Sequence, residues 1–173
     1  MTEDPFGDNE ETVVTLLNAG DAFPKLTLTQ PGGKSMVLPD AFAGSFAVVL
    51  FFRGSWCPYC NTQLRAFQRS SDRLAEAGVK VAALSSDDET ATATLITDLG
   101  LTFPVGHSAD PTAVSAATGA FVNSDPAYLQ STGFLLDPSG NVVVSVYSSG
   151  AIGRLMPDDV TGMVRYVSGS AGH

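Results

Sequence analysis

The strongest hydrophobic pattern in the chain is the run "SFAVVLFF" (45–52), in which apolar residues follow one another without polar alternation. Such a run is typical of a strand buried on both faces, as in the centre of a parallel or mixed sheet. The segment "VKVAALSS" (79–86) predicts a second strand. The earlier segments 20–28 and 30–42 are broken by prolines and a Gly-Gly turn, so they predict short edge strands.

Between these buried strands, apolar positions recur every three or four residues, which predicts an amphipathic helix from Pro58 to about Ala77. Gly78 supplies the stop at its C-terminal end. The buried stripe of this helix is expected to run through Cys60, Leu64, Phe67, Ser71 and Leu74.

The second half of the chain continues to alternate in type. It predicts helices at 87–100, 110–119 and 156–167, a short strand or loop at 101–108, and a hairpin at 132–150. Alternation of this kind predicts an α/β protein with helices packed on a sheet. A parallel β-α-β core completed by an antiparallel hairpin matches the thioredoxin-like fold: a central mixed β-sheet flanked by helices, with a C-terminal β-hairpin and helix.

We expect one such domain over residues 18–168. A loose acidic segment is expected to precede it at 1–17, and a flexible tail to follow at 169–173. The length of 173 residues, with 44% hydrophobic and 16% charged residues, suits a single globular domain.

The formal net charge of −9 makes nucleic acid and anionic membranes poor partners, because both repel an acidic protein. The N-terminus lacks the basic and apolar regions of a secretory signal, and no apolar run approaches the roughly 20 residues that cross a bilayer. These features predict a soluble, cytoplasmic protein without a membrane partner.

Chemistry can be placed at the two cysteines, Cys57 and Cys60, which lie in "FFRGSWCPYCNTQL" (51–64). Three interpretations compete: a redox pair, half of a metal site, and two inert buried thiols. A structural zinc site takes four ligands, and beyond this pair the chain offers only His107 and His173. Because a C-x-x-C pair at a strand-to-helix junction is a strong redox signal, we favour the redox interpretation.

The expected geometry assigns different tasks to the two sulfurs. Cys57 should cap or precede the helix, where unpaired backbone N–H groups and the helix dipole favour a thiolate. Pro58 suits the first helical turn, and Arg53 would act in the same direction if its side chain turns toward the sulfur. Cys60, one turn on and on the apolar stripe, should be more buried, so Cys57 is expected to attack and Cys60 to resolve.

The segment "VVLFFRGSWCPYCNTQLRAF" resembles the active-site segment of thioredoxin-fold redoxins, and more narrowly the alkyl hydroperoxide reductase/thiol-specific antioxidant (AhpC/TSA) family in its peroxiredoxin-like branch with a W-C-P-Y-C motif. The similarity covers about residues 18 to 167. The flanking segments "NAGDAFPKLTL" and "GFLLDPSGNVVVSVYSSGAIGR" also fit peroxiredoxins better than thioredoxin proper.

The resemblance implies two conflicting assignments of the attacking sulfur. The peroxiredoxin pattern of a Pro, a Thr and the peroxide-attacking Cys falls on Arg53, Cys57 and Cys60, whereas thioredoxins use the first cysteine, Cys57. Before the strand "GFLLD", thioredoxin-like reductases have a cis-Pro and peroxiredoxins an Arg, but this chain has Ser131 and then Thr132. Arg53 is a candidate substitute for that Arg. Trp56 is a candidate to shield the sulfur.

The function expected from the resemblance is a thiol-dependent oxidoreductase that reduces hydroperoxides through a Cys57/Cys60 dithiol–disulfide cycle, reset by a thioredoxin-type dithiol donor. A protein-disulfide reductase on the same fold, and a redox sensor that is not an enzyme, remain as alternatives. No metal, flavin or nucleotide cofactor is implied, since there is no Gly-rich phosphate loop. The resemblance also leaves room for a homodimer.

Overall fold

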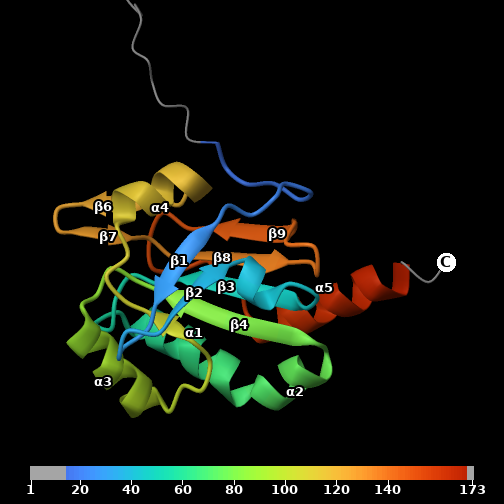
Figure 1. Cartoon of the computed structure of the whole chain (residues 1–173), viewed down its shortest axis with the longest axis horizontal. Helices are drawn as coiled ribbons and strands as arrows, with labels where there is room; N and C mark the ends of the chain where they lie inside the picture. Colours follow the sequence, from blue (N-terminus) through green and yellow to red (C-terminus); the bar gives the residue numbers. More distant parts are fainter. Residues whose placement is uncertain (1–14, 171–173) are drawn as a thin grey trace, which may run out of the picture.

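A computed structural model describes residues 15–170 and contains the predicted central mixed sheet (Figure 1). Its five strands lie in the order β5-β4-β3-β8-β9. They are β3 (Phe46–Phe51), β4 (Val79–Leu84), β5 (Val105–Gly106), β8 (Thr132–Leu136) and β9 (Val142–Tyr147). The first three pair in parallel, while β8 is antiparallel to β3 and β9 to β8, so the β-hairpin expected at 132–150 is confirmed.

The unbroken apolar sequence of β3 is explained by two hydrophobic clusters, one on each face of the sheet. Val48 and Leu50 point into the first cluster, which the helices cover, and the alternate residues Val49 and Phe51 point into the second. Successive side chains of a strand face opposite ways, so a strand with a hydrophobic core on each side buries all of them and is apolar throughout.

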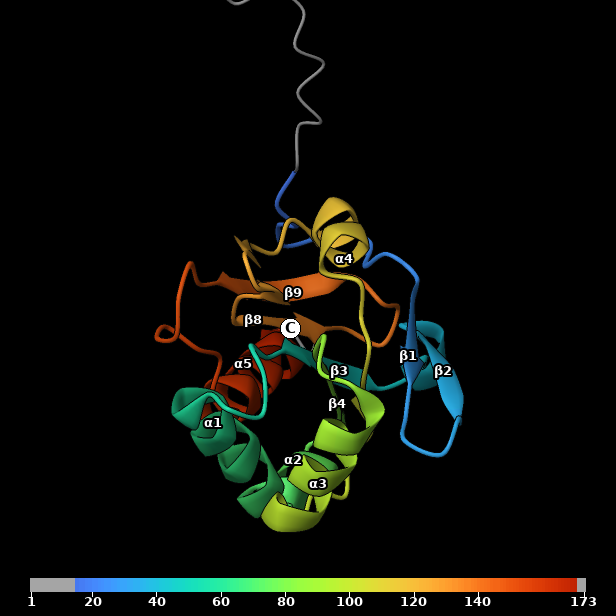
Figure 2. The ribbon, with the colours of Figure 1, turned by 90° about the vertical axis from the view of Figure 1, so that its left-hand side faces the viewer.

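Figure 2 views the molecule with α1 and α5 on one side of the sheet and the β1–β2 ribbon on the other. The helices are α1 (Pro58–Arg69), α2 (Ser71–Glu76), α3 (Glu89–Leu99), α4 (Pro111–Thr118) and α5 (Pro157–Ser170), with a short 3-10 turn, η1 (Asp40–Phe42). Two small antiparallel ribbons complete the fold: β1 (Leu26–Thr29) with β2 (Ser35–Leu38), and β6 (Val122–Ser124) with β7 (Ala127–Leu129).

The single helix expected from Pro58 to Ala77 is in fact two helices. Ser70 ends α1 and also caps α2, and its backbone leaves the helical region there with ψ near 9°. Adjacent serines such as Ser70 and Ser71 favour a break because their short side chains compete for backbone hydrogen bonds. The periodicity still holds across the break, since Leu74 on α2 is buried in the same cluster as Phe67 on α1.

The sequence analysis did not anticipate the β6–β7 ribbon, and α5 continues to Ser170, past the domain boundary expected at residue 168. Most of the 1–17 segment and residues 171–173 lie outside the described residues. Among the residues that the structure does describe, no helix is long and apolar enough to span a bilayer.

Gly133 on β8 lies in close contact with Leu155, in the segment that follows β9. A Cβ atom added at Gly133 would lie 2.9 Å from the Cβ of Leu155 and 3.5 Å from Leu50 Cδ2. Only glycine leaves the room for Leu155, which is 3% exposed, to pack on the sheet.

We expect Gly133→Ala to destabilise the protein by about 1–3 kcal/mol, because the added methyl group overpacks this contact. Urea unfolding followed by circular dichroism measures the change.

A matched control is Gly162→Ala on α5, where an added Cβ meets nothing within 4 Å. This change should stabilise the helix by about 0.5–1 kcal/mol through the better helix propensity of alanine. Equal unfolding midpoints for wild type and Gly133→Ala would show that Leu155 moves freely.

Candidate active site

The segment that joins β3 to α1 is held by hydrogen bonds on both sides. The N–H of Phe52 donates to Leu84 O (3.1 Å), which continues the pairing with β4. The N–H of Ser55 donates to Asp87 Oδ2 (2.7 Å), and Asn61 Nδ2 donates to Ser55 O (3.1 Å). These hydrogen bonds hold the loop between β3 and the start of α1 in place.

Cys57 is the N-cap of α1, as the sequence predicted, and Pro58 occupies the first turn. The Cys57 Sγ accepts the backbone N–H of Cys60 at 3.4 Å. Both thiols are reduced and almost fully buried, Cys57 at 1% and Cys60 at 0% exposure. Cys60 is thus only marginally the more buried of the two.

A second arginine that the sequence analysis did not anticipate, Arg154, reaches both sulfurs. Its Nη2 lies 3.1 Å from Cys60 Sγ and 3.7 Å from Cys57 Sγ. The guanidinium is fixed from behind, because Nη1 donates to Gln63 Oε1 (2.7 Å) and Nε donates to Ala151 O (2.8 Å). Gln63, buried on α1, in turn donates to Leu155 O (2.8 Å).

Arg53 approaches the pair from the other side. Its backbone N–H donates to Cys60 Sγ (3.3 Å), and its Nη1 lies 3.9 Å from Cys57 Sγ. Nη2 donates to the hydroxyl of Tyr128 on β7 (3.0 Å). The guanidinium lies 5.1 Å from the ring centre of Trp56 and 5.3 Å from that of Tyr128, within the range of cation–π attraction.

Trp56 covers this arginine and still leaves 54% of its own surface exposed. Its ring also packs edge-on against Tyr128, with centroids 5.0 Å apart. The indole lies so close to Gly54 that a Cβ there would be 2.2 Å from Trp56 Nε1. Gly54 is therefore required for Trp56 to lie over the loop.

The donors around the sulfurs shift their pKa values in opposite directions. Burial acts to raise the pKa of Cys57, but hydrogen bonds from the Cys60 thiol and N–H and from Arg53, with the charge of Arg154, hold it below its ordinary value. Burial, together with the neighbouring Cys57, raises the pKa of Cys60, against the pull of Arg53 N–H and Arg154. These opposite directions favour ionisation of Cys57 before Cys60.

Ser131 and Thr132 make no hydrogen bond to either sulfur. Thr132 lies in the sheet opposite Phe51, and its hydroxyl donates to Gln130 O (3.1 Å). The carbonyl of Ser131 accepts the N–H of Ser148 (3.0 Å), and the Ser148 hydroxyl bonds to the carbonyl of Ile152 in the loop that carries Arg154. Ser131 thus supports the site indirectly.

Sequence reasoning missed Arg154, Gln63 and Tyr128. One signal was present: Gln63 is a polar residue on the buried face of an otherwise apolar helix, which calls for a buried partner. Arg154 and Tyr128 lie on loop and ribbon segments far along the chain, and only tertiary structure brings them to Cys57 and Arg53.

His107 contacts Ser108, with 2.8 Å between its Nδ1 and the Ser108 Oγ, and no hydrogen bond joins it to the dithiol. Within residues 15–170, no three His, Cys, Asp or Glu side chains are grouped in a way that could hold a metal ion.

A thioredoxin-like sheet and a reduced Cys-x-x-Cys pair at a helix N-terminus are the features of a thiol-dependent oxidoreductase. Comparison with protein families agrees, since the AhpC/TSA family model matches residues 19–145. The chain belongs to the AhpC/TSA family.

Curated relatives support this assignment, and a solved structure shares the fold. The chain is 30% identical over 147 residues to a peroxiredoxin of Treponema denticola, covering 82% of this chain and 69% of that protein. A peroxiredoxin of Methanothermobacter thermautotrophicus is 28% identical with the same coverage. The peroxidoxin BcpB of Mycobacterium tuberculosis superposes with a TM-score of 0.75 at 16% identity, over 87% of this chain and 98% of that one, which shows the shared fold.

The single-cysteine variants should separate the two thiols by their pH dependence. Cys60→Ser keeps Cys57, and we expect its alkylation rate to rise with pH through a lower midpoint than that of Cys57→Ser. Only the thiolate reacts. Cys57 keeps the N–H of residue 60 and contacts from both arginines, whereas burial raises the pKa of the Cys60 thiol. Iodoacetamide rates measured from pH 5 to 10 by mass spectrometry test this order of midpoints. A lower midpoint for Cys57→Ser than for Cys60→Ser would contradict the prediction.

Proposed function

We propose that this protein is a thiol-dependent peroxidase in which Cys57 attacks a hydroperoxide and Cys60 resolves the product to a disulfide. The observation that carries the proposal is the convergence of two guanidinium groups and a helix N-terminus on one buried dithiol. The family and its peroxiredoxin relatives support the same reaction.

In the first step, the Cys57 thiolate attacks the terminal peroxide oxygen. The S–O bond forms as the O–O bond breaks, and the leaving oxygen takes a proton to become an alcohol or water, which leaves a sulfenic acid on Cys57. Charge moves from the sulfur to the leaving oxygen in this step. Arg53 and Arg154, both near Cys57, are placed to stabilise that charge.

In the second step, Cys60 loses its proton and attacks the Cys57 sulfur. The S–S bond forms and water leaves. Arg154 Nη2 at 3.1 Å and the N–H of Arg53 at 3.3 Å are then available to the Cys60 thiolate, because Cys57 no longer carries a negative charge. The two sets of donors thus serve the two steps in turn.

Arg53 takes the place of the arginine that peroxiredoxins have before the strand β8. Its side chain comes from the loop that precedes the dithiol, and Tyr128 and Trp56 hold it there. Ser131, at the position where the family has its arginine, carries no charge, and Tyr128 on β7 contributes a support for Arg53.

The disulfide is then reset by a dithiol donor of the thioredoxin type, in the reducing cytoplasm. Reduction of protein disulfides is a second candidate activity, and the exposed rings of Trp56 and Tyr59 beside the pair favour it, each with 54% of its surface accessible. A homodimer is compatible with either activity.

Hydrogen peroxide consumption in a coupled assay with thioredoxin, thioredoxin reductase and NADPH tests the proposal. Wild type should turn over, and Cys57→Ser should lose turnover. Cys60→Ser should react once and stop at a sulfenic acid that dimedone traps. Disulfide exchange with an oxidised protein, without peroxide consumption, would instead identify the second activity.

Arg53→Met should lower the peroxide rate by about tenfold, equivalent to about 1.4 kcal/mol of barrier. It should also move the midpoint of the pH–rate profile upward, because the rate follows the Cys57 thiolate and Arg53 helps to hold that thiol's pKa down. An unchanged rate and an unchanged midpoint would show that Arg53 does not act on the Cys57 thiolate.

A further inference from the structure

The two guanidinium groups at the dithiol are held almost entirely by neutral partners. Arg154 donates to the side-chain oxygen of Gln63 and to the carbonyl of Ala151. Arg53 donates to the hydroxyl of Tyr128, and its guanidinium lies near the rings of Trp56 and Tyr128. In the described part of the chain, the remaining acceptors of these two groups are the sulfurs: Cys57 for both arginines, and Cys60 for Arg154. Their positions are thus fixed without their charge being cancelled.

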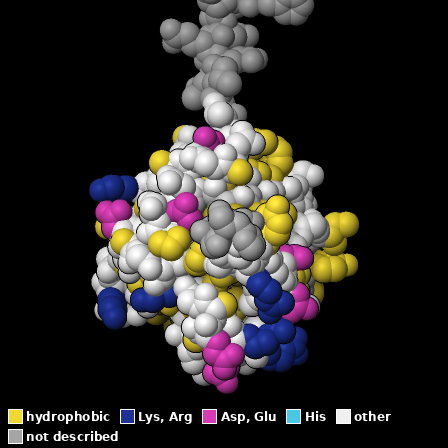
Figure 3. Space-filling view, turned by 90° about the vertical axis from the view of Figure 1, so that its right-hand side faces the viewer, with side chains coloured by type: hydrophobic (Ala, Val, Ile, Leu, Met, Phe, Trp, Pro, Cys, Tyr) yellow, Lys and Arg dark blue, Asp and Glu magenta, His cyan; other side chains and the backbone are white. Residues whose placement is uncertain are grey.

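No carboxylate in the described part of the chain forms an ion pair with Arg53 or Arg154. The ion pairs found there join Lys25 with Asp40 and Arg73 with Asp158, both on exposed side chains. Figure 3 shows such mixing of basic and acidic side chains on a face of the molecule. Asp87, which does touch the active-site loop, accepts the N–H of Ser55.

The charge balance of the site therefore depends on its redox state. When Cys57 is ionised in the dithiol form, its thiolate faces two positive charges. In the disulfide form both sulfurs are neutral, and the two positive charges remain on the half-buried arginines beside the pair, in a protein whose net charge is −9. A local positive field of this kind attracts anions even when the whole molecule is acidic.

We propose that the oxidised site selects an anionic thiol as its reductant, one that carries a negative charge near the attacking sulfur. The inference rests on the proposed dithiol–disulfide cycle and names the class of its electron donor. Once oxidation has removed the protein's own thiolate, the negative charges of the donor would interact with Arg53 and Arg154 in its place.

The step balances as ordinary thiol–disulfide exchange. The donor thiolate attacks Cys57 Sγ, the bond between Cys57 and Cys60 breaks, and the electron pair leaves on Cys60, within reach of Arg154. A second donor thiolate attacks the mixed disulfide, which releases the donor disulfide and the Cys57 thiolate. The donor is oxidised by two electrons and the protein regains its dithiol.

Three small thiols of similar size and different charge test the proposal: 2-mercaptoethanesulfonate (anionic), 2-mercaptoethanol (neutral) and cysteamine (cationic). The disulfide is formed with diamide, so the experiment does not depend on peroxidase activity. Reduction is followed by rapid alkylation and mass spectrometry, and each rate is divided by the thiolate concentration. The anionic thiolate should react about fivefold faster than the neutral one at low salt, and the cationic one slowest.

The advantage of the anionic thiolate should shrink as salt is raised from 0.01 to 0.5 M. Arg154→Met should reduce the ratio between anionic and cationic rates, and Arg154→Lys should restore it. A merely loosened site would change all three rates together. If the variant does not fold, the wild-type order and its salt dependence decide.

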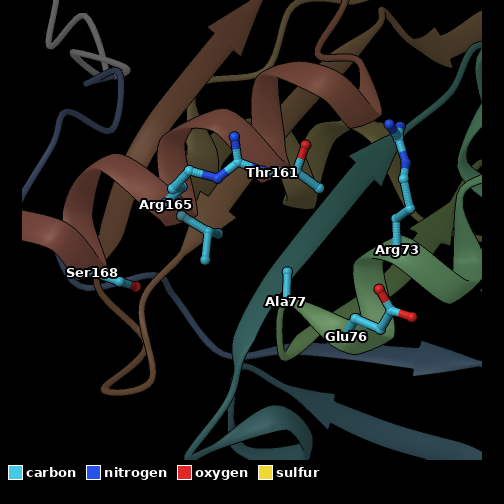
Figure 4. A pocket seen from close by; sticks show the side chains of 7 residues that line it. Arg73, Glu76, Ala77, Thr161, Arg165 and Ser168 are labelled. Carbon is cyan, nitrogen blue, oxygen red and sulfur yellow. The ribbon is translucent and has the colours of Figure 1, made fainter.

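The matched control is Arg165→Met, which removes the same charge at a distance from the dithiol. Arg165 lines a separate pocket of about 440 Å³ between α2 and α5, with Arg73 and Glu76 (Figure 4). Its loss should leave the ratio unchanged. Equal rates per thiolate for the three thiols, or a faster cationic thiol, would overturn the proposal and leave the peroxidase assay unaffected.

A second arm distinguishes the two sources of an anionic thiol. Reduced thioredoxin is compared with the small thiols at low and high salt. A thioredoxin rate that exceeds the 2-mercaptoethanesulfonate rate and falls with salt supports a protein that carries the negative charge around its dithiol. A thioredoxin rate below the 2-mercaptoethanesulfonate rate at low salt supports a small anionic thiol.

Discussion

The chemistry of this protein depends on one junction, where a strand buried on both faces ends and a helix begins at Cys57. The strand fixes the position of the junction, because Phe51 and its neighbours are locked between two cores. The helix start supplies backbone N–H groups that no turn of helix can satisfy. The Cys57 thiol accepts one of these N–H groups in place of a carbonyl oxygen, and the helix holds Cys60 one turn further along, next to Cys57.

Ser131 and Thr132 lie near this junction and act only through the sheet and the neighbouring loop. The positive charge enters instead from Arg53 and from Arg154. Both side chains are long and flexible, so each needs an anchor, and Tyr128 and Gln63 provide anchors that leave the charge intact.

Much of the fold could be read from periodicity and caps. The helices expected at 87–100 and 110–119 agree with α3 and α4 to within one or two residues, and in the structure Asp88 and Asp110 cap them. Local signals also placed Cys57 at the cap. The break at Ser70 was hidden, because the apolar spacing continues through it. The anchors were hidden for another reason: a contact between Arg53 and Tyr128 spans 75 positions, and no local pattern encodes it.

The single tryptophan of the chain, Trp56, lies against the guanidinium that reaches the reactive sulfur. The chain therefore contains its own optical label at the place where its charge changes. Indole emission is sensitive to nearby cations and to the thiol chemistry beside them, so the redox state of the pair can be followed in unmodified protein, without attached dyes.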